Sequence, residues 1–190
     1  MTQSELAARK RYVTVFNRLG LIAVFSAFAF LSTTFIRIPV PVSGGYFNIG
    51  DTFVMAAGVL FGPIIGGFVG LIGPTLSDAI GYPVFIPATA VIKLTEGLLV
   101  GAIGFRAKGA SAAQCIIALV IGGATIVVGY FLFEAYIYPF LAKSSPFFDA
   151  TNVAMAIGEV IPNSFQATIS AILAFGMWKL LKGPASRATR

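Results

Sequence analysis

The chain has 190 residues, of which 57% are hydrophobic and 11% charged, with a net charge of +6, one cysteine and no histidine. This small number of charged residues cannot cover the surface of a soluble domain. The composition therefore excludes an ordinary soluble protein and indicates a membrane protein. Disulfide frameworks, cysteine metal sites and histidine chemistry are excluded as well. We expect one membrane domain over residues 1–190, because spans of about 20 residues with short loops use up this length.

The first apolar segment follows a group of basic residues between positions 9 and 18, and it runs without charge from Leu19 to Ile36. It is too long for the core of a signal peptide, and further apolar segments follow, so we interpret it as a membrane helix. Ala23 and Ala27 form a strip of small residues on one face. Such a strip packs either against another membrane subunit or within the chain.

The next uncharged stretch, Thr52 to Ser77, contains glycine-proline pairs at 62–63 and 73–74. Proline removes a backbone donor and glycine loosens the backbone, so the stretch forms one span or two short helices. The loop charges decide between them, because basic residues concentrate on the cytoplasmic side. Two helices that meet near 62–63 leave only Arg37 and Lys143 in outer loops.

We therefore predict an all-α integral membrane protein, a six-helix transmembrane bundle with two short helices (2 and 3) and both termini cytoplasmic. The predicted spans are 14–36, 51–62, 64–79, 87–105, 111–138 and 153–181. Short helices bounded by glycine and proline often flank binding sites. The outer connections 37–50, 80–86 and 139–152 are longer and more polar, and binding loops are expected there. The positive charge follows this topology, so we expect a lipid bilayer and no nucleic acid as partner.

Glycines recur every four residues in the second and third helices, and two more follow in the fourth. This spacing clears one helix face so that neighbouring backbones approach closely, and packing within the chain is the favoured interpretation. The residues are Gly58, Gly62, Gly66, Gly70, Gly97 and Gly101.

Acidic side chains mark the outer half of the predicted membrane region. Ionisable groups within spans cost about 2.5–3.5 kcal/mol each, so they need a partner or a function. Lys93 and Glu96 are three residues apart on one helix, and they either neutralise each other or face a substrate. Six of the seven acids lie in or beside this region: Asp51, Asp78, Glu96, Glu134, Asp149 and Glu159.

Two polar stripes follow on the last two helices. Together they could surround a flat, polar molecule with donors, acceptors and ring faces, and Pro162 is expected to interrupt the second helix. The alternative is hydrogen bonding between the helices. The stripes are Tyr130, Glu134 and Tyr138 on one helix, and Glu159, Asn163 and Gln166 on the other.

Enzyme motifs are absent from the sequence. It contains no Walker A sequence, no G-x-S-x-G, no H-E-x-x-H and no two-cysteine metal pattern. We therefore expect no enzyme, no metal and no cofactor in this chain.

Four motifs carry a resemblance to a known family: G-G-Y-F-N-I-G-D at 44–51, L-F-G-P-I-I-G at 60–66, L-S-D at 76–78 and P-A-T-A-V-I-K-L-T-E-G-L-L-V-G at 87–101. The chain resembles the substrate-binding S components of energy-coupling-factor (ECF) vitamin transporters. The similar branch includes members for pyridoxine or hydroxymethylpyrimidine, for cobalamin and for riboflavin, and the vitamin stays open among these.

The resemblance implies a high-affinity vitamin-binding subunit in the plasma membrane of a prokaryote, closed by the loops between helices 1–2, 3–4 and 5–6. It also implies a membrane scaffold protein and two ATPase subunits as partners, which use the ATP, with Ala23 and Ala27 docking on the scaffold. Asp51 holds a motif position too, and a structural role at the start of a helix is plausible. The expected substrate-binding residues are Tyr46, Asn48, Asp78, Tyr82, Lys93, Glu96, Glu134, Tyr138, Asn163 and Gln166.

Two rival functions use the same residues differently. A free-standing ion-coupled permease would use Glu96, Glu134 or Glu159 as a proton site. A small membrane scaffold or enzyme would hold no ligand.

Overall fold

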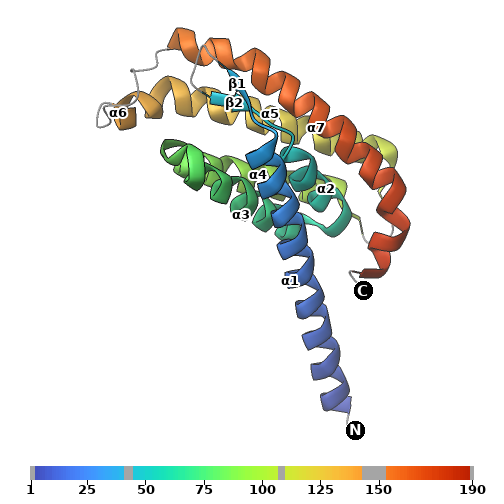
Figure 1. Ribbon diagram of the computed structural model, residues 1–190. Helices are drawn as coiled ribbons and strands as arrows, with labels where there is room; N and C mark the ends of the chain where they lie inside the picture. Colours follow the sequence, from blue (N-terminus) through green and yellow to red (C-terminus); the bar gives the residue numbers. More distant parts are fainter. Residues whose placement is uncertain (1–2, 41–44, 107–109, 143–152, 189–190) are drawn as a thin grey trace.

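The structure is a computed structural model that describes residues 3–40, 45–106, 110–142 and 153–188 (Figure 1). A two-stranded antiparallel hairpin lies between the first two helices. In chain order the elements are α1 (Gln3–Phe35), β1 (Ile38–Val40), β2 (Gly45–Phe47), α2 (Asp51–Phe61), α3 (Pro63–Gly81), the 3-10 turn η1 (Pro83–Phe85), α4 (Ile86–Gly104), α5 (Ala112–Leu132), the π-helical turn η2 (Phe133–Ile137), α6 (Tyr138–Ala142) and α7 (Val153–Ala188).

Five helical segments in the described part of the chain are long and apolar enough to cross a membrane, and α2 is a shorter apolar helix. The prediction of a helical, multi-pass membrane protein is confirmed. The helix ends differ from the prediction, because α1 begins at Gln3 and α7 continues to Ala188. The predicted span 111–138 corresponds to one continuous helical segment, Ala112–Leu141, in which α5 passes through η2 into α6. With 19 residues α3 reaches the length of a span, so of the two helices expected to be short, α2 is short and α3 is not.

The stretch from Thr52 to Ser77 breaks once, at Gly62. There φ is 97°, a left-handed conformation that glycine adopts readily, and the Gly62 N–H closes α2 on the Gly58 carbonyl at 2.9 Å. Pro63 then begins α3, where its missing N–H costs nothing. The interruptions expected at Pro74 and Pro162 are wrong, because each proline lies inside a continuous helix. Membrane helices tolerate proline where neighbouring groups satisfy the freed backbone.

Glycines bring α2, α3 and α4 into backbone contact. A Cβ on Gly66 would lie 2.6 Å from the Gly58 Cα, and a Cβ on Gly97 would collide with the Gly66 carbonyl group. A Cβ on Gly70 would collide with the carbonyl oxygen of Lys93 on α4. The structure thus confirms the close-packing interpretation of the glycine repeat, and it places Lys93 at a point where three helices meet.

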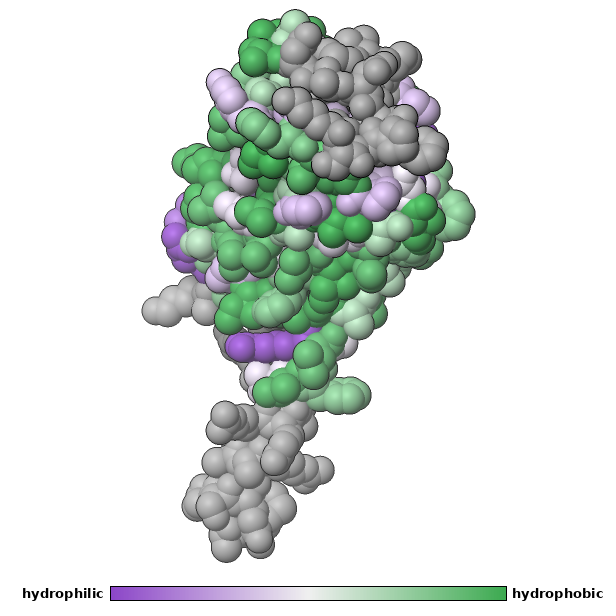
Figure 2. Space-filling model, turned by 90° about the vertical axis from the view of Figure 1, so that its left-hand side faces the viewer, coloured by the Kyte–Doolittle hydropathy of each residue, from purple (hydrophilic) through white to green (hydrophobic). Residues whose placement is uncertain are grey.

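The outer surface of the bundle is apolar. Figure 2 shows hydrophobic side chains over most of the visible face. The exposed fractions of Phe16, Val120 and Leu180 are 78%, 63% and 81%, a surface suited to lipid and not to water. Both chain ends lie on the side away from the β1–β2 hairpin (Figure 1).

Candidate functional site

A cavity lies where the β1–β2 region meets α3, α4, α5 and α7. It holds about 380 Å³ of space not filled by atoms, part of it open to solvent. Three carboxylates, three amides, three aromatic rings and one threonine line it, a mixture that suits a small polar molecule with a flat ring. The lining residues are Tyr46, Asn48, Asp78, Phe85, Thr89, Tyr130, Glu134, Glu159, Asn163 and Gln166.

The hairpin positions Tyr46 at one wall of this cavity. The Tyr46 hydroxyl donates a hydrogen bond to the Asp78 carboxylate on α3. The Arg37 guanidinium lies 4.9 Å from the centre of the Tyr46 ring and donates to the Ser77 carbonyl at 2.7 Å, which ties the hairpin to α3. Burial, and next the negative charge of Asp78, raise the pKa of the Tyr46 phenol far above its ordinary value. The phenol therefore remains a proton donor at physiological pH.

Asn48 and Gln166 lock the first loop onto α7. The Asn48 backbone N–H and side-chain Nδ2 donate to Gln166 Oε1 at 2.9 and 3.2 Å, and Gly50 N–H donates to Asn48 Oδ1 at 2.8 Å. Gln166 Nε2 in turn donates to Asp51 Oδ2 at 2.7 Å. The two amides thus line the cavity and also hold α2, α7 and the loop together.

Beside the cavity lies a group that we call the ion cluster, formed by Asp51, Lys93 and Glu96. Lys93 Nζ is 2.5 Å from Asp51 Oδ1 and 3.5 Å from Glu96 Oε2, and none of the three side chains is more than 2% exposed. The ammonium also lies 5.3 Å from the centre of the Tyr130 ring. The structure favours neutralisation over a substrate-facing role for Lys93 and Glu96, with Asp51 as the nearer partner.

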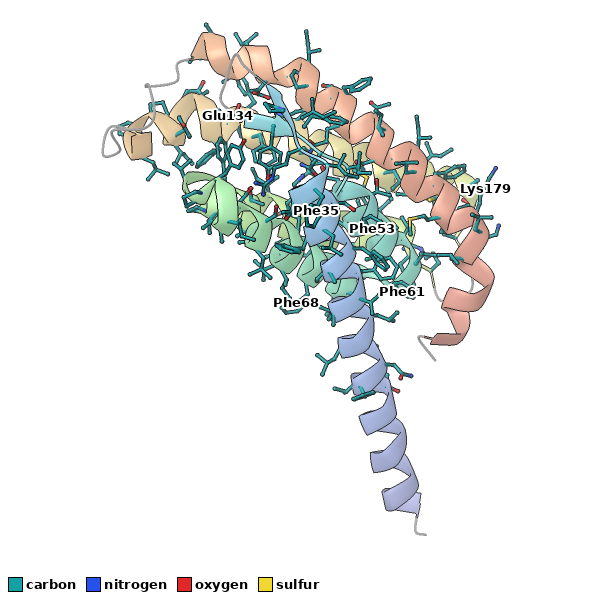
Figure 3. The ribbon with its side chains drawn as sticks, viewed as in Figure 1. Phe35, Phe53, Phe61, Phe68, Glu134 and Lys179 are labelled. Carbon is teal, nitrogen blue, oxygen red and sulfur yellow. The ribbon has the colours of Figure 1, made fainter. Side chains whose placement is uncertain are left out.

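Glu134 on η2 and Glu159 on α7 also line the cavity. They are 5% and 3% exposed, and they lie close enough to interact electrostatically. Figure 3 shows Glu134 toward one end of the α5–α7 pair and Lys179 toward the other end. A π turn changes the helical register. Tyr138 follows Glu134 by four residues, one turn of an α-helix. Its side chain does not line the cavity and packs against Phe85, with ring centres 5.4 Å apart.

Six of the ten predicted substrate-binding residues meet at the cavity wall: Tyr46, Asn48, Asp78, Glu134, Asn163 and Gln166. The other four do not line it. Lys93 and Glu96 belong to the ion cluster, and Tyr138 belongs to an aromatic cluster with Phe85. Tyr82 packs against Tyr46 with tilted rings whose centres are 4.6 Å apart.

Four lining residues were absent from the predicted set. Tyr130 and Glu159 lie in the two polar stripes, and helical periodicity could have selected them. Thr89 lies one helical turn before Lys93, and its hydroxyl is 3.0 Å from the Tyr130 hydroxyl. Phe85 precedes a helix and has no signal in the sequence that separates it from other aromatic residues.

The strip of small residues on α1 lies on the outer surface. Ala23 and Ala27 are exposed and line an open apolar groove between α1 and α3, with about 770 Å³ of unfilled space. The two alanines are therefore not buried within the bundle.

An apolar helical bundle with an internal polar cavity defines a class of protein, one that binds a small molecule within a membrane. Comparisons with known proteins agree with this class. The family model of the ECF-type riboflavin transporter S component matches residues 15–183. A solved structure described as the S component of a bacterial ECF transporter has the same fold, with a TM-score of 0.67 at 22% identity, covering 87% of this chain and 95% of that chain.

Two relatives are similar in sequence. An uncharacterized protein in the gap 3' region of Pyrococcus woesei is 35% identical over 152 residues, covering 80% of this chain and 93% of that protein. A UPF0397 protein of Leuconostoc citreum (strain KM20) is 36% identical over 76 residues, 40% of each protein.

The chain belongs to the family of ECF-type riboflavin transporter S components. It is the substrate-binding subunit of an ECF transporter, and S components of this kind are transport proteins, not enzymes. The resemblance carried by the four sequence motifs is thereby confirmed.

Proposed function

We propose that this chain captures a vitamin or vitamin precursor at the outer face of a prokaryotic plasma membrane and passes it inward in an ECF module. The module would contain one membrane scaffold protein and two ATPases, which hydrolyse the ATP. The observation that carries the proposal is the cavity, because its amides, carboxylates and ring faces converge in an otherwise apolar bundle.

The position of the cavity supports capture from outside. Tyr46 and Asn48 come from the connection between α1 and α2, and Phe85 comes from the connection between α3 and α4. Arg37 is in the first of these connections, whereas most basic residues are near the chain ends, so the charge rule supports cytoplasmic termini and an outward cavity. The third expected closing loop is 139–152, and its residues 143–152 lie outside the described residues.

The groove on α1 supports docking on the scaffold. Small side chains let two membrane helices approach closely, and Ala23 and Ala27 offer such a face without a covering helix among the described residues. A leucine at either position would fill the groove while leaving the cavity unchanged.

The test combines binding with uptake. We expect the purified chain to retain a vitamin-class molecule, identified by mass spectrometry, and uptake in cells to stop when the partner ATPases are inactive. Ala27→Leu should abolish uptake and leave the affinity unchanged. The control Val24→Leu, on the exposed α1 surface outside the groove, should change neither uptake nor affinity. Normal transport by Ala27→Leu would contradict the docking assignment. Uptake by this chain alone, abolished by an uncoupler, would instead favour an ion-coupled permease.

A further inference from the structure

Buried carboxylates outnumber buried cations in the described part of the chain. Lys93 is the one buried basic side chain there, and both Asp51 and Glu96 already neutralise it. Five acidic side chains are no more than 5% exposed: Asp51, Asp78, Glu96, Glu134 and Glu159. Three of these, Asp78, Glu134 and Glu159, line the cavity.

Asp78 has partners within the chain. It accepts the hydrogen bond from Tyr46, and the charges of Arg37 and Lys93 both act favourably on its ionised form. Arg37 is held over the rings of Tyr46 and Tyr82, at 4.9 and 5.1 Å from their centres. Arg37, a half-buried cation near the cavity, is therefore engaged by Ser77 and by the two tyrosine rings.

Glu159 is in a different position. Its Oε1 atom has no hydrogen-bond partner among the described residues, although the side chain is 3% exposed and lines the cavity. Its negative charge acts unfavourably on the neighbouring carboxylate of Glu134. A buried carboxylate oxygen without a partner is costly, so Glu159 calls for a positive group that the described residues do not supply at its Oε1 atom.

The ring faces beside the pair suit such a group. Tyr130 and Phe85 line the same cavity, and aromatic faces attract cations in addition to stacking on flat rings. Tyr46 provides a third ring on the hairpin side.

We infer that the substrate is an organic cation, a flat heteroaromatic molecule with a protonated amine or a quaternary nitrogen. This inference rests on the proposed function. The positive group of the substrate binds between Glu159 and Glu134, and its ring lies against the cavity aromatics. Asn163 and the other amides bind its remaining polar groups.

The experiment begins with the molecule that the purified chain retains, identified by mass spectrometry together with its charge at neutral pH. Affinities are then measured by calorimetry for two probe pairs that differ in charge: pyridoxamine against pyridoxine, and thiamine against riboflavin. We expect a cation in the protein and tighter binding of the cationic probe in at least one pair.

Variants of Glu159 assign the effect to the cavity. Glu159→Gln should weaken binding of the retained cation about 30-fold or more, while Glu159→Asp keeps most of the affinity. Ser164→Ala, an exposed control that hydrogen-bonds only to the Val160 carbonyl of its own helix, should change nothing. A neutral or anionic molecule bound in the cavity, or unchanged cation affinity in Glu159→Gln, overturns the inference and leaves the proposed function intact. A chain that retains no small molecule and binds none of the four probes contradicts both.

Discussion

The ion cluster and the cavity are neighbours built from the same kinds of side chain, yet they have opposite character. In the ion cluster, one ammonium lies within 4 Å of two carboxylates, and all three side chains are sealed from solvent. In the cavity, Glu159 lies beside amides and rings, and its Oε1 atom has no hydrogen-bond partner among the described residues. The difference teaches that an acid inside a membrane protein is structural where an opposite charge meets it, and available for a ligand where it does not.

Gln166 joins the two regions. Its Nε2 donates to Asp51 of the ion cluster, and its Oε1 accepts from Asn48 at the cavity wall. The fixed cluster thus holds one side of the cavity in place, so that binding depends on a rigid support.

The largest expected effect comes from breaking the ion cluster. Lys93→Met removes the ammonium and leaves Asp51 and Glu96 buried side by side, which should destabilise the protein by about 3–5 kcal/mol. Thermal unfolding in detergent measures this loss. The control Thr95→Ala, whose hydroxyl bonds only to its own helix, should stay close to the wild type. An unchanged melting temperature in Lys93→Met would show that the cluster does not stabilise the fold.

A smaller loss should follow from disturbing the contact that supports the cluster. Gly70→Ala places a Cβ against the Lys93 carbonyl oxygen and should cost about 1–3 kcal/mol of unfolding free energy through overpacking. Gly20→Ala is the matched control, because nothing lies within 4 Å of a Cβ there. Equal stability of the two variants would contradict the close approach of α3 and α4.

Cavity variants should change affinity more than stability. Asn163→Ala removes a polar group from the wall and should weaken ligand binding by about 1–3 kcal/mol, with a melting temperature near that of the wild type. Gln166→Ala should lower both quantities, because this side chain serves both regions. Calorimetry and thermal unfolding on the same samples separate the two effects. Unchanged affinity in both variants would move the site elsewhere.

The smallest effect is expected at the hairpin. Tyr46→Phe keeps the ring and deletes only the hydroxyl that donates to Asp78, so affinity should fall by about 0.5–1.5 kcal/mol. Ligand dissociation should become faster, because the hairpin is held less firmly. Stopped-flow measurement of the dissociation rate tests this, and a rate equal to that of the wild type would separate the hairpin from ligand retention.

The fold was predictable because its signals are local. Charge spacing marked the spans, and Gly62-Pro63 marked the helix break correctly, since both features act through the backbone of their own segment. Pro74 carried a similar signal but lies inside α3, because surrounding helices decide whether a proline breaks a membrane helix.

The site was predictable only in part, for a physical reason. Helical spacing identified Glu134, Asn163 and Gln166 as residues of the cavity wall. It could not show that the nearest partner of Lys93 is a carboxylate of the chain and not a substrate. That partner is Asp51, which lies on a different helix and 42 positions earlier by residue number. Helical spacing also failed for Tyr138, which follows the π turn directly. A change of register inside a helix leaves no regular period in the sequence.

The central claim is that the cavity beside the ion cluster holds the substrate, and native mass spectrometry of two tryptophan variants tests it most directly. Asn163→Trp fills the cavity from its wall, whereas Ser164→Trp places the same bulk on the exposed surface of the same helix. With both variants folded, as judged by thermal unfolding, we predict that Ser164→Trp retains one bound molecule and Asn163→Trp has lost it. Retention of the molecule by Asn163→Trp would contradict the account.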